Sequence, residues 1–216
     1  CVEMQENTEV LADQRVRFTQ PLRVGQNIRP QGQETRAGEQ VLAAGAAGVG
    51  SVSTELSDLL GAGTGLGVSG LLPDGRGGWV PLQGEGGHVT LPAATPRERL
   101  VMDGLARLHG RASAERLCSG QGLVDAFTLL CEADGVALSG LNTAAAVTDA
   151  ALKARQPQAL EALNMLCAVL GSVAGNLALT LGARGGVYIG GGIVPRLGTW
   201  FEGSPFRARF EAKGRF

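Results

Sequence analysis

The chain has 216 residues, a formal net charge of −1 at pH 7 and 44% hydrophobic residues. This length suits one good-sized domain or two small ones, and the near-neutral charge gives no electrostatic basis for binding nucleic acid or an anionic membrane. The four cysteines show no CxxC spacing, and only two histidines could join them, so we expect a reducing compartment with no disulfide framework and no metal site. Glycine, at 34 residues, is about twice its usual share of ~7%, which points to turns and backbone-lined sites.

The first fifty residues are expected to form an unassigned, irregular segment. Glutamines and scattered arginines interrupt any period there, and the stretch 25–40 has the composition of disordered chain. The opening CVEMQENTEV places charges where a signal peptide needs an apolar core, so we expect a cytoplasmic protein.

In the run GAGTGLG, which starts at Gly61, glycine occupies every other position. Leu66 to Leu72 predicts a strand and Ser57 to Leu60 its partner, so Gly63, Thr64 and Gly65 are placed at a hairpin turn. The run is not a P-loop, because no Gly-Lys-Ser/Thr follows, and it lacks the strict dinucleotide spacing. A purely structural turn and a phosphate-binding turn both stay open, and the hydroxyl of Thr64 favours phosphate.

A second glycine-rich run, Gly84 to His88, surrounds one carboxylate and one imidazole with residues that have no side chains. This arrangement would let a polar ligand approach both the backbone and the side chains of Glu85 and His88. The alternative for His88 is a structural histidine with satisfied hydrogen bonds, which the flanking glycines and Glu85 disfavour.

Four helices are expected after this run. Thr95 to Glu98 forms a capping box with proline at the first helical position, and a helix with an apolar face of Val101, Leu105 and Leu108 should end at Gly110. Ser113 can cap a short second helix with Glu115 in its first turn, where complementing the helix dipole would be a sufficient structural role. The third has a face of Leu123, Phe127 and Leu130 and ends near Gly135, and the fourth runs from Asn142 or Thr143 to about Arg155.

From Ala162 to Ala183 the chain holds no charged residue, which is long enough to span a bilayer. Polar residues interrupt it, however, and its leucines keep a helical stripe, so we predict a buried helix of a soluble protein between Pro157 and Gly182. A strand at 187–189 follows, which is typical of an α/β domain. Gly190, Gly191 and Gly192 then lie at the end of that strand, where α/β sheets place ligands.

These motifs together resemble the bacterial glucokinases of the hexokinase/actin-like ATPase superfamily. The resemblance rests on LGAGTGLGVSGL, on VPLQGEGGH, on SAERLCSG and on GGVYIGGGIVPR, in the family's order, and it continues into FRARFEAKGRF. It covers roughly residues 59–216 and leaves the first fifty residues uncovered. The resemblance implies an α/β fold of the ribonuclease H-like kind, in which 51–216 form the large domain with a mixed sheet and flanking helices, truncated.

The resemblance also implies an ATP-dependent, Mg²⁺-requiring kinase that phosphorylates glucose or a similar hexose at the 6-hydroxyl, with a homodimer as a common assembly. Glu85, His88 and Glu115 would bind the sugar. Gly63, Thr64 and Gly65 would bind the phosphates, and Gly191 and Gly192 would border the adenosine.

The family's Asp-x-Gly-Gly-Thr phosphate loop and its Asn-Asp pair, which supplies the catalytic base, have no match here. Asp13 and Asp58 stand in other contexts. We therefore expect an incomplete form that lacks the catalytic aspartate. Two alternatives stay open: an inactive sugar- or nucleotide-binding module, and the product of a truncated or frame-changed gene in which residues 1–50 are not native.

Overall fold

The computed structural model describes residues 8–10, 16–18, 57–74, 76, 79–82, 84–138 and 140–214. The chain divides into two compact units, and the second contains all the described residues from Ser57 onward. In the first unit, β1 (Thr8–Val10) and β2 (Val16–Phe18) pair antiparallel. The remainder of the N-terminal segment that we expected to be irregular lies outside the described residues.

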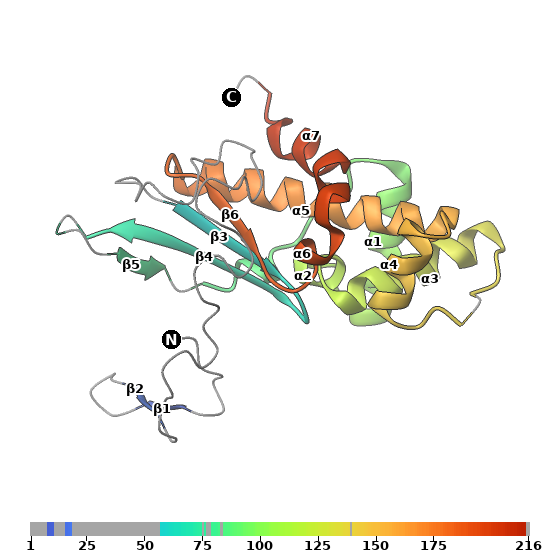
Figure 1. Ribbon diagram of the computed structural model, residues 1–216, viewed down its shortest axis with the longest axis horizontal. Coiled ribbons are helices and arrows are strands. Elements are labelled where there is room, and N and C mark those ends of the chain that lie inside the picture. The colour runs from blue at the N-terminus through green and yellow to red at the C-terminus, as the bar shows by residue number, and fades with distance from the viewer. Residues whose placement is uncertain are drawn as a thin grey trace. The chain divides into compact units, whose positions relative to one another are not determined.

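The second unit is built on a four-stranded mixed sheet of order β5-β4-β3-β6 (Figure 1). The strands are β3 (Ser57–Ala62), β4 (Leu66–Pro73), β5 (Trp79–Leu82) and β6 (Val187–Gly190). The pairs β3–β4 and β4–β5 are antiparallel, whereas β6 pairs parallel with β3. The predicted hairpin is confirmed, because β3 and β4 are joined through residues 63–65.

In the second unit, the helices α1 to α5 follow the strands β3, β4 and β5, and β6 comes after these helices. The α-helices are α1 (Pro96–His109), α2 (Ala114–Leu117), α3 (Gly120–Asp134), α4 (Ala144–Leu152), α5 (Pro157–Leu181), α6 (Val194–Leu197) and α7 (Phe206–Glu211). The short 3-10 helices are η2 (Gly86–His88) and η3 (Gly198–Gly203). A mixed sheet with flanking helices is the α/β architecture expected from the sequence.

The helix ends follow from local side-chain chemistry. Thr95 Oγ1 accepts a hydrogen bond from the Glu98 N–H at 3.1 Å, Pro96 begins α1, and Gly110 ends it in the left-handed conformation. Ser113 and Thr143 cap α2 and α4 in the same way. Each such cap satisfies an N–H group that would otherwise lack a partner and is worth about 1 kcal/mol.

The predicted apolar face of α1 is wrong at its last residue. Val101 and Leu105 are buried, but Leu108 is 60% exposed. A Cβ on Gly104 would lie 2.5 Å from the Leu129 side chain, so α1 and α3 approach closely one turn before Leu108. Two helices that cross at an angle separate away from such a contact, which leaves Leu108 in water.

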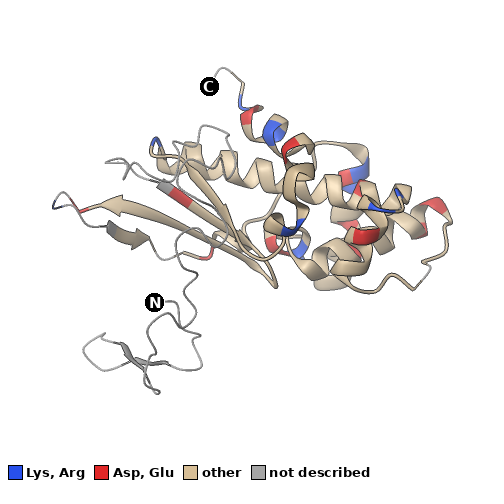
Figure 2. Cartoon of the chain, in the orientation of Figure 1, with Lys and Arg blue, Asp and Glu red and all other residues tan. Residues whose placement is uncertain are grey.

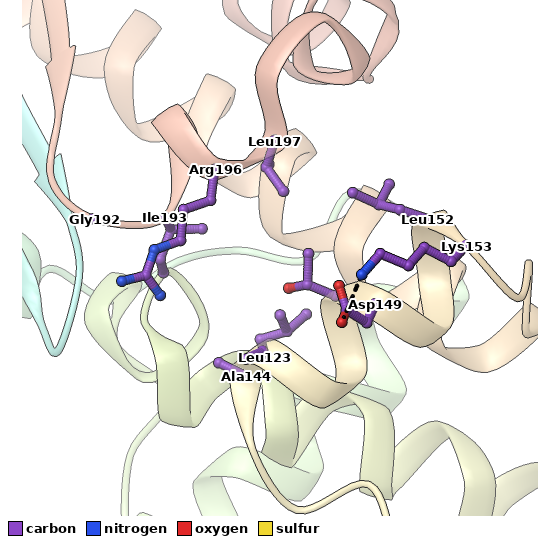
Figure 3. A pocket seen from close by; sticks show the side chains of 11 residues that line it. Leu123, Ala144, Asp149, Leu152, Lys153, Gly192, Ile193, Arg196 and Leu197 are labelled. Carbon is purple, nitrogen blue, oxygen red and sulfur yellow. Dashed lines mark ion pairs between the residues drawn. The ribbon is translucent and has the colours of Figure 1, made fainter. Parts of the chain in front are cut away.

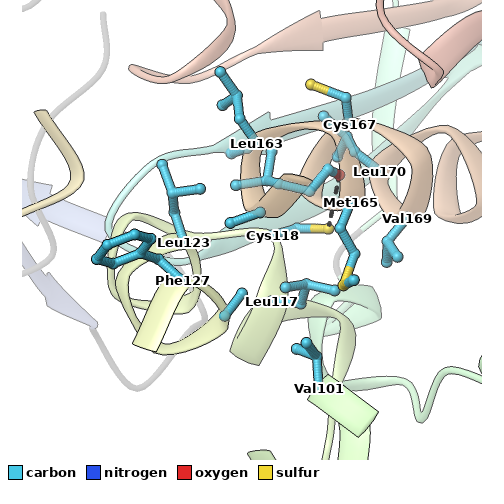
Figure 4. Close-up of a cluster of buried hydrophobic side chains, with 14 of the residues drawn as sticks. Val101, Leu117, Cys118, Leu123, Phe127, Leu163, Met165, Cys167, Val169 and Leu170 are labelled. Atoms are coloured by element: carbon cyan, nitrogen blue, oxygen red, sulfur yellow. Dashed lines mark hydrogen bonds between the residues drawn. The ribbon is translucent and has the colours of Figure 1, made fainter. Parts of the chain in front are cut away.

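The long helix α5 is the centre of the core (Figures 1 and 4). It packs against α3, α4, α7 and β3, and it begins at Pro157 and ends at Gly182 as predicted. It is long and apolar enough to cross a membrane, but Leu163, Leu166 and Leu170 are fully buried within the protein. Each Å² of apolar surface that is buried in this way stabilises the fold by about 25 cal/mol, which makes this burial the main stabilising term. The helix α5 is therefore placed as a core helix.

The core contains buried thiols and the buried carboxylate of Asp58. Cys118, at the end of α2, donates to the Leu166 carbonyl, and burial raises the pKa of Cys167 to about 12, so these thiols stay protonated and unreactive. Asp58 is the single charged residue on the four strands of the sheet (Figure 2). It shares the inner face of β3 with Leu60 and Ala62 and is fully buried, and neither of its carboxylate oxygens has a hydrogen-bond partner among the described residues.

The stability of the fold should therefore fall as the pH rises. Burial raises the pKa of Asp58 from 3.8 to about 6, so the folded chain holds this proton more tightly than the unfolded chain. The loss of stability occurs between about pH 4 and pH 6 and reaches on the order of 3 kcal/mol above pH 6. Asp58→Val should raise the urea midpoint at both pH values, because it removes a buried polar group, and the rise should be clearly larger at pH 7.5 than at pH 4.

Asp58→Asn is the matched control, because it keeps the shape and polarity of the side chain but cannot ionise. It should flatten the pH dependence without the full gain of the valine variant. A wild-type urea midpoint that is equal at pH 4 and pH 7.5 would contradict the assignment.

Candidate active site

The hairpin turn between β3 and β4 is held by its own backbone and by the start of α3. The Gly63 N–H donates to the Gly65 carbonyl at 2.8 Å, and the Gly120 N–H donates to the Gly63 carbonyl at 2.9 Å. The N–H groups of Thr64 and Gly65 have no partner among the described residues, and Thr64 is exposed. The turn thus offers two N–H groups and a hydroxyl to an anion, whereas the N–H of Gly63, which we expected to contribute, is already used.

The loop after β6 lies directly beside this turn. The Ile193 N–H donates to the Ala62 carbonyl at 3.1 Å, and a Cβ on Gly63 would lie 3.8 Å from the Gly192 nitrogen. The two glycine-rich runs therefore meet at one end of the sheet, as a single nucleotide spanning both would require.

Gly191 and Gly192 differ in why they are glycine. Gly191 has a φ of 85°, and a Cβ there would lie 2.2 Å from the Ala62 carbonyl oxygen. Its lack of a side chain is needed for the packing of this loop against β3. Gly192 is not in the left-handed region, and a Cβ there would meet open space, so this residue can face a ligand.

A cavity of about 360 Å³ opens next to Gly192 (Figure 3). Its walls come from the start of α3, from α4, and from α6 with the two residues before it. The residues that line it are Leu123, Ala144, Ala145, Thr148, Asp149, Leu152, Lys153, Gly192, Ile193, Arg196 and Leu197. The walls are largely apolar, and Asp149 and Lys153 form an ion pair of 2.9 Å at the rim. This size and lining suit a flat heteroaromatic group.

The α4 wall of this cavity was missed in the sequence. The sequence predicts a helix from Asn142 or Thr143 to about Arg155 and assigns it no ligand, and in the structure Val147 and Ala151 form its buried face. The cavity-lining residues are the others, and an exposed helix face carries no pattern that distinguishes a ligand wall from ordinary surface.

The three predicted sugar-binding side chains lie close together, with Glu85 and Glu115 each near one ring nitrogen of His88. Glu85 Oε2 lies 3.8 Å from His88 Nε2, and Glu115 Oε1 lies 3.9 Å from His88 Nδ1. Glu85 and His88 are mostly exposed, whereas Glu115 is 31% exposed. Two carboxylates and an imidazole this close together can accept and donate several hydrogen bonds to a polyhydroxyl ligand.

Glu115 also contacts the turn. Its second oxygen, Oε2, accepts a hydrogen bond from the Leu66 N–H at 3.0 Å. The N-terminal position of Glu115 in α2 is thus used for more than the helix dipole, which was the structural alternative.

The glycines beside His88 are explained by packing. A Cβ on Gly87 would lie 2.1 Å from the Leu66 carbonyl oxygen, and one on Gly86 would lie 2.7 Å from Val68. These residues let η2 lie directly on β4, which places His88 and Glu85. We had interpreted them as space for a ligand, and the contacts with β4 give a sufficient physical reason without one.

No described residue fills the role of catalytic base. The carboxylate of Asp58 is buried on the inner face of β3, away from these groups. Within the described part of the chain there is also no cluster of three or more His, Cys, Asp or Glu side chains that could hold a metal ion.

Gly191 and Gly192 form a matched pair for testing this geometry. Gly191→Ala should lower the free energy of unfolding by about 1–3 kcal/mol, because a left-handed backbone and a contact with the Ala62 carbonyl both oppose a Cβ. Gly192→Ala should leave the free energy of unfolding within ~0.5 kcal/mol of wild type. Equal urea midpoints for the two variants would contradict this distinction.

Comparison with known proteins gives a consistent result. A family model described as glucokinase matches residues 37–216. The glucokinase of Aromatoleum aromaticum is 55% identical over 161 residues, and that of Chromobacterium violaceum is 54% identical over 157 residues. Each match covers 73% of this chain, with 47% of the first relative and 44% of the second, so the chain spans about half the length of these relatives.

Solved structures agree with the sequence matches. A glucokinase from an Antarctic psychrotroph superposes with a TM-score of 0.68 at 33% identity, covering 76% of this chain and 50% of that one. A glucokinase from Balamuthia mandrillaris, solved in complex with glucose, superposes with a TM-score of 0.64 at 25% identity, covering 74% and 46%.

The family match corrects one expectation. It begins at residue 37, so the view that the first fifty residues are uncovered is wrong for 37–50. This stretch is rich in alanine and glycine and carries none of the family's motifs.

Proposed function

The chain belongs to the glucokinase family, and we propose that it carries the hexose and nucleotide sites of a kinase that transfers the γ-phosphoryl group of ATP to the 6-hydroxyl of glucose. The observation that carries this proposal is the position of the turn 63–65 between two candidate sites. On one side the turn lies against Gly192, which lines the cavity, and on the other side it contacts Glu115, which lies beside His88. A phosphate chain that runs from the cavity over the turn would end near a sugar held by Glu85, His88 and Glu115.

The nucleotide is assigned to the cavity and the turn. The adenosine would occupy the 360 Å³ cavity beside Gly192, and the Thr64 and Gly65 N–H groups would hold phosphate oxygens. Mg²⁺ usually binds through substrate phosphates and water and needs few protein ligands.

The hexose is assigned to the cluster around His88. Ionised carboxylates accept strong hydrogen bonds from hydroxyls, and the imidazole can donate or accept one more. A site that pairs each hydroxyl rejects analogues that lack one far more strongly than an apolar pocket does. This supports a hexose as the phosphoryl acceptor.

In the reaction, the oxygen of the sugar 6-hydroxyl forms a bond to the γ-phosphorus while the bond from that phosphorus to the β–γ bridging oxygen breaks, and ADP leaves. The protein contributes positioning and stabilisation of the charge on the phosphoryl oxygens. The hydroxyl proton passes to a general base, which in this family is an aspartate that we do not find in this chain. From the family alone we also propose a cytoplasmic location and a homodimer.

A second candidate function rests on the missing base. With both binding sites and no base, the chain would be a sugar- or nucleotide-binding module without turnover. The two candidates differ in catalysis and not in binding.

The nucleotide assignment can be tested at Thr148, in the α4 wall of the cavity. Thr148→Trp should fill the cavity and weaken MgADP binding by about tenfold or more, which is ~1.4 kcal/mol. Thr148→Val keeps the volume of the side chain and is the matched control, which should bind MgADP much as wild type does. Titration calorimetry gives both affinities, and unchanged binding by a folded Trp variant would place the nucleotide elsewhere.

Turnover separates the two candidate functions. We expect the purified 216-residue chain not to phosphorylate glucose, because the loss of a general base alone lowers rates by about 10²–10⁴-fold. A coupled assay for ADP release with glucose and MgATP measures this directly. Glucose-dependent turnover above a blank would show that a base is present after all and would exclude the binding-module candidate.

A further inference from the structure

Glu115 makes two different contacts with its two carboxylate oxygens. Oε2 accepts from the Leu66 N–H at 3.0 Å, and Oε1 lies 3.9 Å from His88 Nδ1 on the side assigned to the hexose. Leu66 is the first residue of β4 and directly follows the turn 63–65. One rigid, planar group therefore lies between the phosphate turn and the sugar site.

The backbone that carries Glu115 is firmly held. Ser113 caps α2, and the Ala114 N–H donates to the Val89 carbonyl at 2.9 Å, one residue after His88. The start of α2 and the segment that carries His88 are thus joined, so the position of the Glu115 carboxylate is set relative to both sites.

Gly65 is fitted to this carboxylate. A Cβ there would lie 2.4 Å from Glu115 Oε2 and 3.2 Å from its carboxyl carbon. The backbone of Gly65 is not left-handed, so its conformation would accept alanine. Gly65 is therefore glycine in order to admit the Glu115 carboxylate against the turn.

The contact from Glu115 fixes the outgoing side of the turn. The incoming side is held by the Gly63 N–H bond within the turn and by the Gly120 N–H bond to Gly63. Between these anchors lie the two N–H groups, of Thr64 and Gly65, that would bind phosphate. The Leu66–Glu115 hydrogen bond holds the residue that directly follows these two N–H groups.

We propose that Glu115 is a positioning residue that couples hexose binding to nucleotide binding through the Leu66 N–H, an inference that rests on the proposed function. A sugar hydroxyl bound to Oε1 fixes the plane of the carboxylate and so holds Oε2 on Leu66. The turn is then ordered before phosphate arrives, and the entropy of ordering it is lost in the first binding step and not again in the second. Each ligand consequently strengthens the binding of the other by the same factor.

The test measures the Kd of MgAMPPNP by calorimetry with and without saturating glucose. In wild type, glucose should tighten nucleotide binding by about fivefold or more. In Gly65→Ala, the new Cβ displaces the carboxylate from Leu66, so the two Kd values should become equal. Gly67→Ala is the matched control. Gly67 lies two residues further along the chain, in β4, and a Cβ there would meet nothing nearer than the Gly61 carbonyl at 3.9 Å, so this variant should keep the coupling.

Hydrogen–deuterium exchange distinguishes coupling from a purely structural role of Glu115, because a structural role would not make the exchange rates at the turn depend on glucose. Glucose should slow exchange of the amides at 64–66 in wild type and in Gly67→Ala but not in Gly65→Ala. Glu115→Gln keeps an oxygen that can accept from Leu66, so it should weaken glucose binding yet retain part of the coupling.

The outcomes separate the inference from the proposed function. If wild type binds both ligands but its nucleotide Kd is the same with and without glucose, the inferred coupling does not exist and the proposed function is unaffected. The coupling is also wrong if Gly65→Ala keeps the wild-type ratio. If wild type binds neither ligand, the proposed function falls, and the inference with it.

Discussion

The parallel pairing of β3 with β6 is the constraint on which the candidate site depends. It aligns Asp58 to Gly61 with Val187 to Gly190, so both strands end at the same edge of the sheet. The carboxyl ends of parallel strands are where α/β proteins bind ligands, since the loops that leave them diverge and expose backbone groups. Here the two loops are the turn 63–65 and the run 190–192, and they touch through the Ala62 carbonyl.

Much of this arrangement could be predicted from local sequence. Proline, glycine and Ser/Thr caps determine helix ends through one or two residues, so the bounds of α1 and α5 were close to those predicted. Alternating glycines indicated the turn, and the uncharged run indicated a buried helix. Where a structure depends on short-range chemistry, a single sequence suffices.

The rest depends on contacts between distant segments, which leave no local pattern. The Leu66 N–H bond to Glu115 joins positions 49 residues apart, and the α4 wall of the cavity exists only because α6 lies opposite it. The buried carboxylate of Asp58 was equally invisible, because its residue type is normal for a surface turn. The roles of individual glycines were the hardest to predict from the sequence. Gly65 and Gly87 provide room for another group, and Gly191 provides both room and a left-handed backbone.

The order of the strands also limits when the site can exist during synthesis. The N-terminal member of the parallel pair, β3, precedes the helices α1 to α5, and its partner β6 follows them. Helices form from neighbouring residues, whereas the pairing of β3 with β6 must close a long loop that contains the helices α1 to α5. A nascent chain that has emerged only as far as α5 can hold the hairpin and the helical core, yet the turn 63–65 still lacks the loop beside it. The candidate nucleotide site is therefore completed only after residues 187–197 have left the ribosome, when β6 pairs with β3 and α6 closes the cavity beside Gly192.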